Sequence, residues 1–399
     1  MCTEGRPGTS SLSSVKRAIT NCINLQTVIL KLGPRETPWT QNEVLSALYH
    51  LPSLKTLHLY VEPSYLYRLR LATGSSLNTL THFRIEYLAL GYLENEAARQ
   101  MSGRNLSQFI SRCPNLISLE VAFPGLDLTD IFPGIRSGDM SRVPPIQHLS
   151  LYSVGKTPLV RDIPNLQSLA IRLDPESEFL DIWDLLRQRR IFPRKILTDR
   201  SIYESDLLNY LHDHPRLESL LLYPVNTSRI PDVVGEQLAL ASFCEVVQRH
   251  AQHIVEFVLC PSPSWVPPFW NWSWVRERME PALLSCRNMQ RLGFRISEDY
   301  TEMQESLHQL LRLSAEVFDD LQDLHIYFYS DVQHPHPLAP RPFMHLDSNN
   351  PSERLKLAIE KAVLAYEVDD WRKYNYELHI HQRTWSVTFG ETKFTCTRP

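Results

Sequence analysis

The residues best suited to metal chemistry in this sequence are histidines, which gather at three places. They occur at 212–214 (HDH), at 334–337 (HPHP) with His345 nearby, and at 379–381 (HIH). A zinc site needs three or four ligands that converge with tetrahedral geometry, and short histidine tracts are only compositional hints. His212 and His214 close a helical pattern, where histidine is favoured by the helix dipole. We therefore predict no metal site and no cofactor.

Signatures of catalysis are missing from the sequence. It contains no G-x-S-x-G, no G-x-x-x-x-G-K-[ST], no G-x-G-x-x-G and no H-E-x-x-H, the patterns that mark common nucleophile, phosphate, dinucleotide and zinc sites. The carboxylates of Asp319, Asp320 and Asp323 stand at a predicted helix–strand junction and are adequately explained as solvated turn residues. We expect that the protein is not an enzyme.

Tryptophan is concentrated in the stretch PSPSWVPPFWNWSW, residues 261–274. Four of the eight tryptophans stand in it: Trp265, Trp270, Trp272 and Trp274. Tryptophan is enriched at binding hot spots, so one hypothesis is an exposed aromatic patch that captures a partner. The alternative, which we favour, is that the rings fold back onto the rest of the chain, because large apolar patches are rarely left exposed.

A repeated phrase organises most of the remaining chain. Eight segments carry an apolar residue at each position of L-x-x-L-x-L: 22–30 (CINLQTVIL), 51–59 (LPSLKTLHL), 113–121 (CPNLISLEV), 144–151 (PPIQHLSL), 163–171 (IPNLQSLAI), 214–222 (HPRLESLLL), 286–294 (CRNMQRLGF) and 318–326 (FDDLQDLHI). Alternation of apolar and polar residues predicts a strand with one buried face. A phrase that recurs along a chain is typical of a solenoid.

Helical patterns precede several of these strands. They cover 40–50, 105–113, 204–214, 236–250, 272–286 and 301–318. Proline follows at Pro52, Pro114, Pro164 and Pro215, where it ends the helix. Repeated units of helix, stop and strand favour parallel strands joined by helical crossovers.

Cysteine serves this pattern as a packing residue. The seven cysteines form no C-x-x-C pair, and three of them share one position, three residues before the first leucine. That position is filled by Cys22, Cys113 and Cys286, and elsewhere by Leu51, Ile163 and His214. Free cysteine behaves as a small apolar residue, so we predict burial rather than catalysis. Reduced thiols also fit a cytoplasmic or nuclear protein.

The phrase and its irregular spacing resemble the repeat arrays of F-box/leucine-rich-repeat proteins, notably the large fungal set, over about residues 20–330. The resemblance implies an α/β leucine-rich-repeat solenoid with a curved parallel sheet and helices on its convex side. It also implies a non-catalytic substrate-recognition domain that recruits targets to an SCF-type ubiquitin ligase. Repeats usually span roughly 20–29 residues, so degenerate units are expected to fill the long gaps, at 80–88, 192–200 and 253–260.

The ends of the chain differ from the middle. We expect an N-terminal tail or truncated segment at 1–20, the solenoid at 21–330, a Pro/His-rich connector at 331–351, and a C-terminal helix plus β cap at 352–399. An F-box would be a helical segment ahead of the repeats, and none precedes Cys22. We therefore expect an SCF adaptor as partner only if an F-box lies upstream.

Residues between the inward leucines are predicted to face outward on the concave side of the sheet. Tyrosine, arginine and histidine recur there, and recognition surfaces favour such residues. The candidate partner-binding residues are His58, Tyr60, Tyr152, Arg172, Tyr223, Arg295, His325 and Tyr327. The alternative is that these side chains shield the strand ends.

Charge and hydropathy restrict the partner class. Lysine and arginine number 41 against 45 acidic residues, a formal net charge of −4, which gives no general attraction to nucleic acid or anionic membrane. No apolar stretch is long enough to span a membrane, and the N-terminus lacks the apolar core of a signal peptide. We expect protein targets, no nucleic acid and no membrane. Three functions stay open: substrate recognition in an F-box-type protein, a stand-alone leucine-rich-repeat scaffold, and, with least support, a metal-dependent enzyme.

Overall fold

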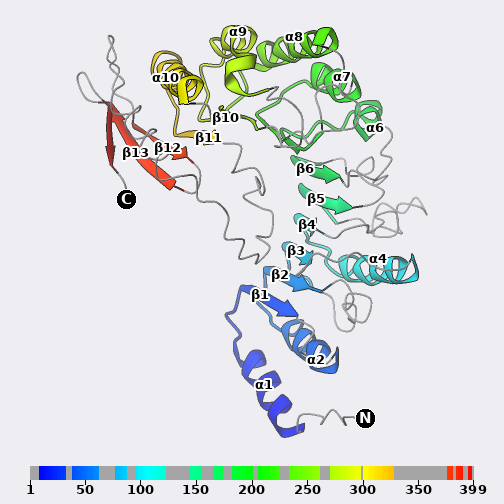
Figure 1. Ribbon diagram of the computed structural model, residues 1–399. Coiled ribbons are helices and arrows are strands. Elements are labelled where there is room, and N and C mark those ends of the chain that lie inside the picture. Colours follow the sequence, from blue (N-terminus) through cyan, green and yellow to red (C-terminus); the bar gives the residue numbers. More distant parts are fainter. Residues whose placement is uncertain are drawn as a thin grey trace, which may run out of the picture. The chain divides into compact units, whose positions relative to one another are not determined.

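The computed structural model of the protein divides into two compact units, Met1–Ile191 and Phe192–Pro399, called unit 1 and unit 2 below. The structure describes residues 9–32, 38–62, 77–87, 96–122, 144–154, 163, 165–173, 182–200, 205–223, 233–260, 270–297, 300–327, 375–380, 383–389 and 394–397. Figure 1 shows these elements in chain order. The predicted connector at 331–351 and helix at 352–368 lie outside the described residues.

Unit 1 contains a parallel sheet whose strands follow the order of the sequence. The strands are β1 (Thr27–Leu32), β2 (Thr56–Val61), β3 (His82–Tyr87), β4 (Ser118–Ala122), β5 (His148–Val154) and β6 (Ser168–Leu173). Its helices are α1 (Thr9–Asn21), α2 (Pro38–Leu48), α4 (Glu96–Ile110) and α6 (Ile182–Arg189). Helices α2 and α4 lie on the same side of the sheet (Figure 1).

Unit 2 repeats this arrangement and ends in antiparallel strands. Its parallel strands are β7 (Lys195–Thr198), β8 (Ser219–Leu222), β9 (Glu256–Leu259), β10 (Arg291–Arg295), β11 (Asp323–Tyr327) and β12 (Asn375–Ile380). Strands β13 (Arg383–Phe389) and β14 (Phe394–Thr397) then pair antiparallel. The helices α7 (Ser205–Asp213), α8 (Val233–His250), α9 (Trp272–Leu283) and α10 (Tyr300–Val317) form one layer beside the sheet (Figure 1).

The register explains why the leucines repeat. In unit 1 each strand pairs with the next without offset at its start, so Leu57 lies beside Phe83 and Leu59 beside Ile85. All four side chains are buried, and burying one such side chain contributes about 1.5–3 kcal/mol. Inward residues therefore stack in continuous rows between the sheet and the helices. Each unit is accordingly an α/β leucine-rich-repeat solenoid, and the predicted fold class is confirmed.

The turn before the strand explains the wording C-x-N-L. Leu116 N–H donates to the Cys113 carbonyl over 3.1 Å, and Met289 N–H donates to the Cys286 carbonyl over 3.3 Å. This bond closes a β-turn, in which proline is favoured at the second position. The asparagines link neighbouring repeats, since the Asn115 amide donates to the Asn78 carbonyl over 2.7 Å. Cys113 and Cys286 are buried, as their packing role predicts, whereas the same prediction is wrong for Cys22, which is exposed.

The helices and strands of the structure can be placed on the segments expected from the sequence. Residues 9–20 of the expected N-terminal tail or truncated segment lie in α1, which contacts α2 as the helix of a first repeat. The single solenoid predicted at 21–330 contains the boundary between two compact units. The degenerate units at 80–88, 192–200 and 253–260 are confirmed as β3, β7 and β9, and the β cap has three strands.

Candidate partner-binding face

The outward side chains of unit 1 form three rows across the strands, because neighbouring strands share one register. The first row starts each strand, the middle row follows two residues later, and the end row two residues after that. The middle row is Ile29, His58, Arg84, Glu120, Ser150 and Ala170, and the end row is Lys31, Tyr60, Glu86, Ala122, Tyr152 and Arg172. We call these two rows the unit 1 face.

A charged cluster occupies the centre of the unit 1 face. Arg84 donates its Nε–H to Glu86 Oε1, and the same nitrogen lies 3.2 Å from Glu120 Oε1. His58 Nε2 lies 3.0 Å from Glu86 Oε1. One guanidinium is therefore shared by two carboxylates, which come from adjacent strands. We call His58, Arg84, Glu86 and Glu120 the charged cluster.

Burial controls protonation in this cluster. Burial raises the pKa of Glu120 to about 7, although the Arg84 charge acts in the opposite direction. Burial and the Arg84 charge lower the pKa of His58 to about 4. At neutral pH His58 is therefore uncharged, and the positive charge of the cluster comes from Arg84.

Aromatic side chains border the charged cluster. The His58 and Tyr60 rings lie 4.2 Å apart between centroids, and Lys31 Nζ lies 5.5 Å from the centre of the Tyr60 ring. That distance allows a cation–π interaction. Burial raises the pKa of the Tyr152 hydroxyl, so this group stays protonated and can donate a hydrogen bond.

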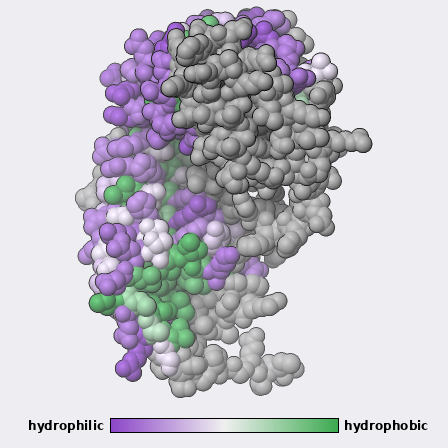
Figure 2. Space-filling view, turned by 90° about the vertical axis from the view of Figure 1, so that its left-hand side faces the viewer, coloured by the Kyte–Doolittle hydropathy of each residue, from purple (hydrophilic) through white to green (hydrophobic). Residues whose placement is uncertain are grey.

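Apolar side chains are exposed at the N-terminal end of unit 1. Ile29 is 63% exposed in β1, and Ile23 and Val15 are also exposed. Figure 2 shows hydrophobic colour gathered in the lower part of the view, at the height of β1 and β2 in Figure 1, with hydrophilic residues around it. Because Ile29 stands next to His58 in the middle row, the unit 1 face combines an apolar edge with a charged centre.

The outward residues of unit 2 have a different character. Its middle row is Leu197, Leu221, Val258, Gly293 and His325, and its end row includes Tyr223, Arg295 and Tyr327. We call these two rows the unit 2 face. A Cβ placed on Gly293 would lie 3.0 Å from Val258 Cγ2 and 3.2 Å from Tyr327 Cε2. Tyr327 thus lies across the glycine, and it interacts with Tyr223 through a side-chain hydrogen bond.

The eight predicted partner-binding residues fall into two groups. His58, Tyr60, Arg172, His325 and Tyr327 are partly exposed. Tyr152, Tyr223 and Arg295 are each only 5% exposed, so they offer little surface to a partner. Tyr223 forms a side-chain hydrogen bond with Tyr327. The alternative, in which such side chains shield the strand ends, therefore describes this pair better.

Two residues of the charged cluster, Arg84 and Glu86, were missed by the sequence prediction. They lie in β3, whose repeat has Phe83 and Ile85 in place of leucines. A signal was present, because the segment HFRIEY alternates polar and apolar residues at the spacing of a strand.

Trp270 and Trp272 pack inward, as the favoured alternative for the stretch 261–274 expects, and do not form the exposed aromatic patch of the other hypothesis. Trp270 and Trp272 are buried and Trp274 is half-buried, while Trp265 lies outside the described residues. The Trp272 ring packs against Phe294, 4.7 Å between centroids, and its Nε1–H donates to Gln309 over 3.0 Å. These rings therefore fold back into unit 2 and fill its core.

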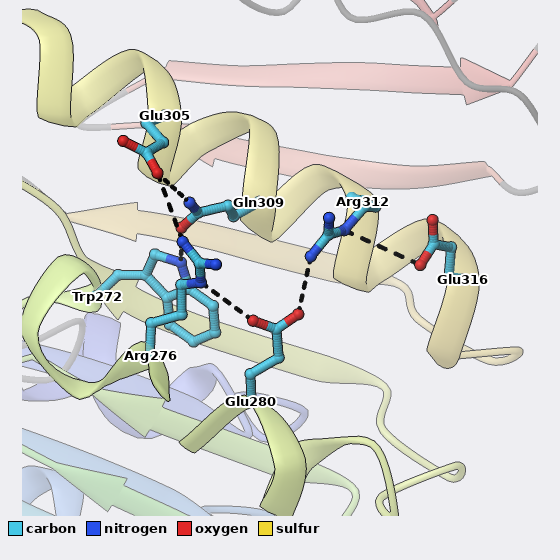
Figure 3. A network of polar contacts seen from close by, with 7 residues as sticks. All are labelled: Trp272, Arg276, Glu280, Glu305, Gln309, Arg312 and Glu316. Atoms are coloured by element: carbon cyan, nitrogen blue, oxygen red, sulfur yellow. Dashed lines mark hydrogen bonds and ion pairs between the residues drawn. The ribbon is translucent and has the colours of Figure 1, made fainter. Parts of the chain in front are cut away.

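A polar network holds α9 against α10 around Trp272 (Figure 3). Glu280 of α9 lies 3.2 Å from Arg276 and 2.9 Å from Arg312 of α10. Arg276 also reaches Glu305 over 3.5 Å. The sequence WNWSWVRERME thus serves helix packing in unit 2.

The histidines at 212–214 serve structure as well. His214 is buried; its Nε2 lies 3.0 Å from the Pro193 carbonyl, and its Nδ1 accepts the Arg216 N–H over 3.2 Å. His212 is exposed. Within the described residues, no group of three or more His, Cys, Asp or Glu side chains could hold a metal ion. The histidines at 334, 336 and 345 lie outside those residues.

The comparisons with known proteins do not assign the chain to a family. No protein-family model matches the sequence, and no curated protein matches it. Among solved structures, the chain is similar to an internalin from Listeria monocytogenes, with 11% identity over 85% of this chain and 93% of the internalin, at a TM-score of 0.34. The fold assignment rests on the strand order and register described above. None of the described helices is long and apolar enough to cross a membrane.

Proposed function

We propose that the protein is a non-catalytic protein-binding module and that the unit 1 face receives its partner. The observation that carries the proposal is the register of β1 to β4, which brings Ile29, His58, Tyr60 and Arg84 together on one surface. All four are at least partly exposed. Protein interfaces combine apolar and aromatic contacts with arginine and a polar rim, and this surface offers each of them.

The charge of the face favours protein over nucleic acid as the partner. Nucleic-acid sites gather lysine and arginine to neutralise phosphates. In the charged cluster two carboxylates share a single guanidinium, and His58 is uncharged at neutral pH because its pKa is lowered to about 4. The charged cluster therefore offers no excess of positive charge to a phosphate backbone.

The test begins with proximity labelling in the native cell, followed by affinity measurement with each purified neighbour. Variants Ile29→Ala and Tyr60→Ala should weaken binding by about tenfold or more, as truncation of central contact residues does. The matched control is Leu238→Ala on α8, because Leu238 is 65% exposed and Ile29 63%. Equal affinities for the wild type and both face variants would contradict the proposal.

Within this function, we propose that the chain recognises substrates for an F-box-type protein of an SCF ubiquitin ligase, in the cytoplasm or nucleus. The wording and irregular spacing of the repeats support this role. Labelling with the protein expressed from its own locus should then recover the SCF adaptor among the neighbours. Partners without any adaptor would favour a stand-alone leucine-rich-repeat scaffold instead.

A further inference from the structure

Two carboxylate oxygens of the charged cluster form no hydrogen bond with any residue that the structure describes. Glu86 is fully buried, at 0% exposure, and its Oε1 accepts the Arg84 Nε–H. Its Oε2 is buried without any hydrogen-bond partner, and the same holds for Glu120 Oε1, which has only the ion-pair contact with Arg84. Buried polar atoms nearly always have partners, so two such oxygens on adjacent strands need an explanation.

Charge in the cluster is also out of balance. Glu86 and Glu120 face one guanidinium, and Glu120 becomes fully ionised only above about pH 7, because its pKa is raised to that value. His58 adds no charge at neutral pH because its pKa is lowered. The other cations of the unit 1 face stand at its two ends. Lys31 lies two strands from Glu86 and Arg172 three strands away, about 10 and 14 Å at the usual strand spacing. A further positive group at the centre would be stabilised.

We propose that the pair Glu86 and Glu120 receives a lysine or arginine side chain from the protein partner. The inference rests on the proposed function, because it assumes that the partner lies on the unit 1 face. A cationic donor would satisfy the two oxygens and complete the charge balance, and bonds between charged donors and carboxylates are the strong ones. Access runs past side chains that keep part of their surface exposed: Arg84 at 24%, and His58 and Glu120 at 12% each.

The geometry favours a side chain over a resident metal ion. Metal sites need several ligands around one point, and the described residues contain no group of three or more His, Cys, Asp or Glu side chains suited to one. The Arg84 guanidinium already lies between the two carboxylates, and it would repel a small divalent ion more than a guanidinium that can stack. Arginine and lysine then differ, since arginine offers a planar fork of donors.

The test uses short random peptides selected for binding to the full chain. The best peptide is remade with each arginine replaced by citrulline and each lysine by norleucine, which keeps length and removes charge. Affinities are measured for the wild type, Glu86→Gln, Glu120→Gln, Tyr60→Ala and Leu238→Ala. We expect one cation whose neutralisation weakens binding to wild type by about tenfold or more, and much less to Glu86→Gln. Urea unfolding of each variant establishes that it is folded.

The outcomes separate the inference from the proposed function. Peptides that need Tyr60 but tolerate every neutral replacement would overturn the cation inference and leave the binding face standing. Neutralisation that costs wild type and both glutamine variants equally would also overturn it, because the cation would then contact another site. If no selected peptide responds to Tyr60→Ala, the binding face itself is contradicted, and the cation inference with it.

Discussion

The unit 1 face and the unit 2 face occupy equivalent positions on their strands, but their middle rows differ in solvent exposure. The middle row of unit 1 contains Arg84 and Glu120, both partly exposed, whereas the same row in unit 2 contains Val258 at 1% exposure and Gly293, also buried. Period-two alternation gives every strand an outward row. Whether that row is a surface depends on the side chains that lie across it.

Tyr327 shows how the outward row of unit 2 becomes core. Its ring lies across Gly293 and Val258, and its hydroxyl interacts with Tyr223 on β8, three strands from its own β11. A side chain larger than hydrogen at 293 would meet this ring. Unit 2 thus buries Val258 and Gly293 in its outward middle row, while the unit 1 middle row keeps Ile29, His58, Arg84 and Glu120 at least partly exposed.

A charge placed in the two middle rows should produce the largest difference. Ile29 and Val258 are β-branched residues in the middle rows of unit 1 and unit 2, and they are 63% and 1% exposed. Val258→Asp would bury an unpaired carboxylate and should lower the free energy of unfolding by about 3–5 kcal/mol or prevent folding. Ile29→Asp should change it by less than about 1 kcal/mol. Urea unfolding measures both, and similar losses would show that the two rows are equally buried.

The glycine of the unit 2 face gives the next largest effect. Gly293→Val adds a branched side chain where even a Cβ would lie 3.0 Å from Val258 Cγ2, and overpacking of this kind costs about 2–3 kcal/mol. Ser150→Val, in the equivalent row of unit 1, removes one side-chain hydrogen bond to Tyr152 and should lower the free energy of unfolding by about 1 kcal/mol or less, which is a smaller loss than that of Gly293→Val. Thermal and urea unfolding provide the measurement. A neutral Gly293→Val would mean that Tyr327 moves away without cost.

Much of the fold could be predicted from the sequence because its signals are local. The apolar positions in segments such as CPNLISLEV specify an inward face by alternation alone, and proline marks the end of some helices, as at Pro52 and Pro114. Even β3 could be predicted, since Phe83 and Ile85 take the leucine positions. The first repeat shows the limit: Cys22 is exposed and Cys113 is buried, although both stand at the same place in the phrase. A residue at this position is buried only where a repeat packs on each side of its own repeat, and the repeated phrase does not show whether both neighbours are present.

The binding face could be predicted only in part. His58 and Tyr60 follow from alternation, but the burial of Tyr223 depends on Tyr327, more than a hundred residues later in the sequence. Arg84 and Glu86 form a charged cluster only together with Glu120 on the next strand. Sequence spacing alone does not show that Glu120 lies beside them. Outward direction is a local property, whereas exposure and charge pairing are properties of the assembled sheet.

Protonation of Glu120 should make the stability of unit 1 depend on pH. Burial raises its pKa to about 7 from 4.5, so the folded state holds a proton that the unfolded state releases. Its stabilising contribution is complete below about pH 4.5 and is lost as pH rises through 7. Glu120→Gln does not titrate, so its stability relative to wild type should increase by about 1–2 kcal/mol between pH 5 and pH 8.

Three neighbouring groups bear on this comparison: His58, Arg84 and Tyr152. Burial raises the pKa of Tyr152, so its hydroxyl stays protonated between pH 5 and pH 8. His58 has a lowered pKa and acts in the opposite direction, since its contribution is lost as pH falls from about 6.5 to 4. It is present in both proteins and largely cancels in the difference. A difference that stays constant from pH 5 to pH 8 would show that Glu120 has an ordinary pKa.

The ion pairs of Arg291 in unit 2 should contribute the smallest change in the free energy of unfolding. Arg291 lies between Glu256 and Asp323, 3.0 Å from Asp323 Oδ2, and its side chain is 46% exposed. Exposed ion pairs contribute about 0–1 kcal/mol and are screened by salt. Arg291→Met should therefore lower the free energy of unfolding by about 0.5 kcal/mol in dilute buffer and by less in molar salt.

Arg84→Met is the matched variant in unit 1, because Arg84 also stands between two carboxylates. One of these, Glu86, is fully buried, whereas Glu256 and Asp323 retain 15% and 21% of their side-chain surface. Salt screens buried charges poorly, so removal of Arg84 should cost more stability than removal of Arg291, and the loss should change little between dilute and molar salt. If both arginine variants lose the same amount of stability and both losses shrink in molar salt, the charged cluster is exposed to solvent. Its carboxylate oxygens would then be bonded to water, and the argument for a cation from the partner would fail.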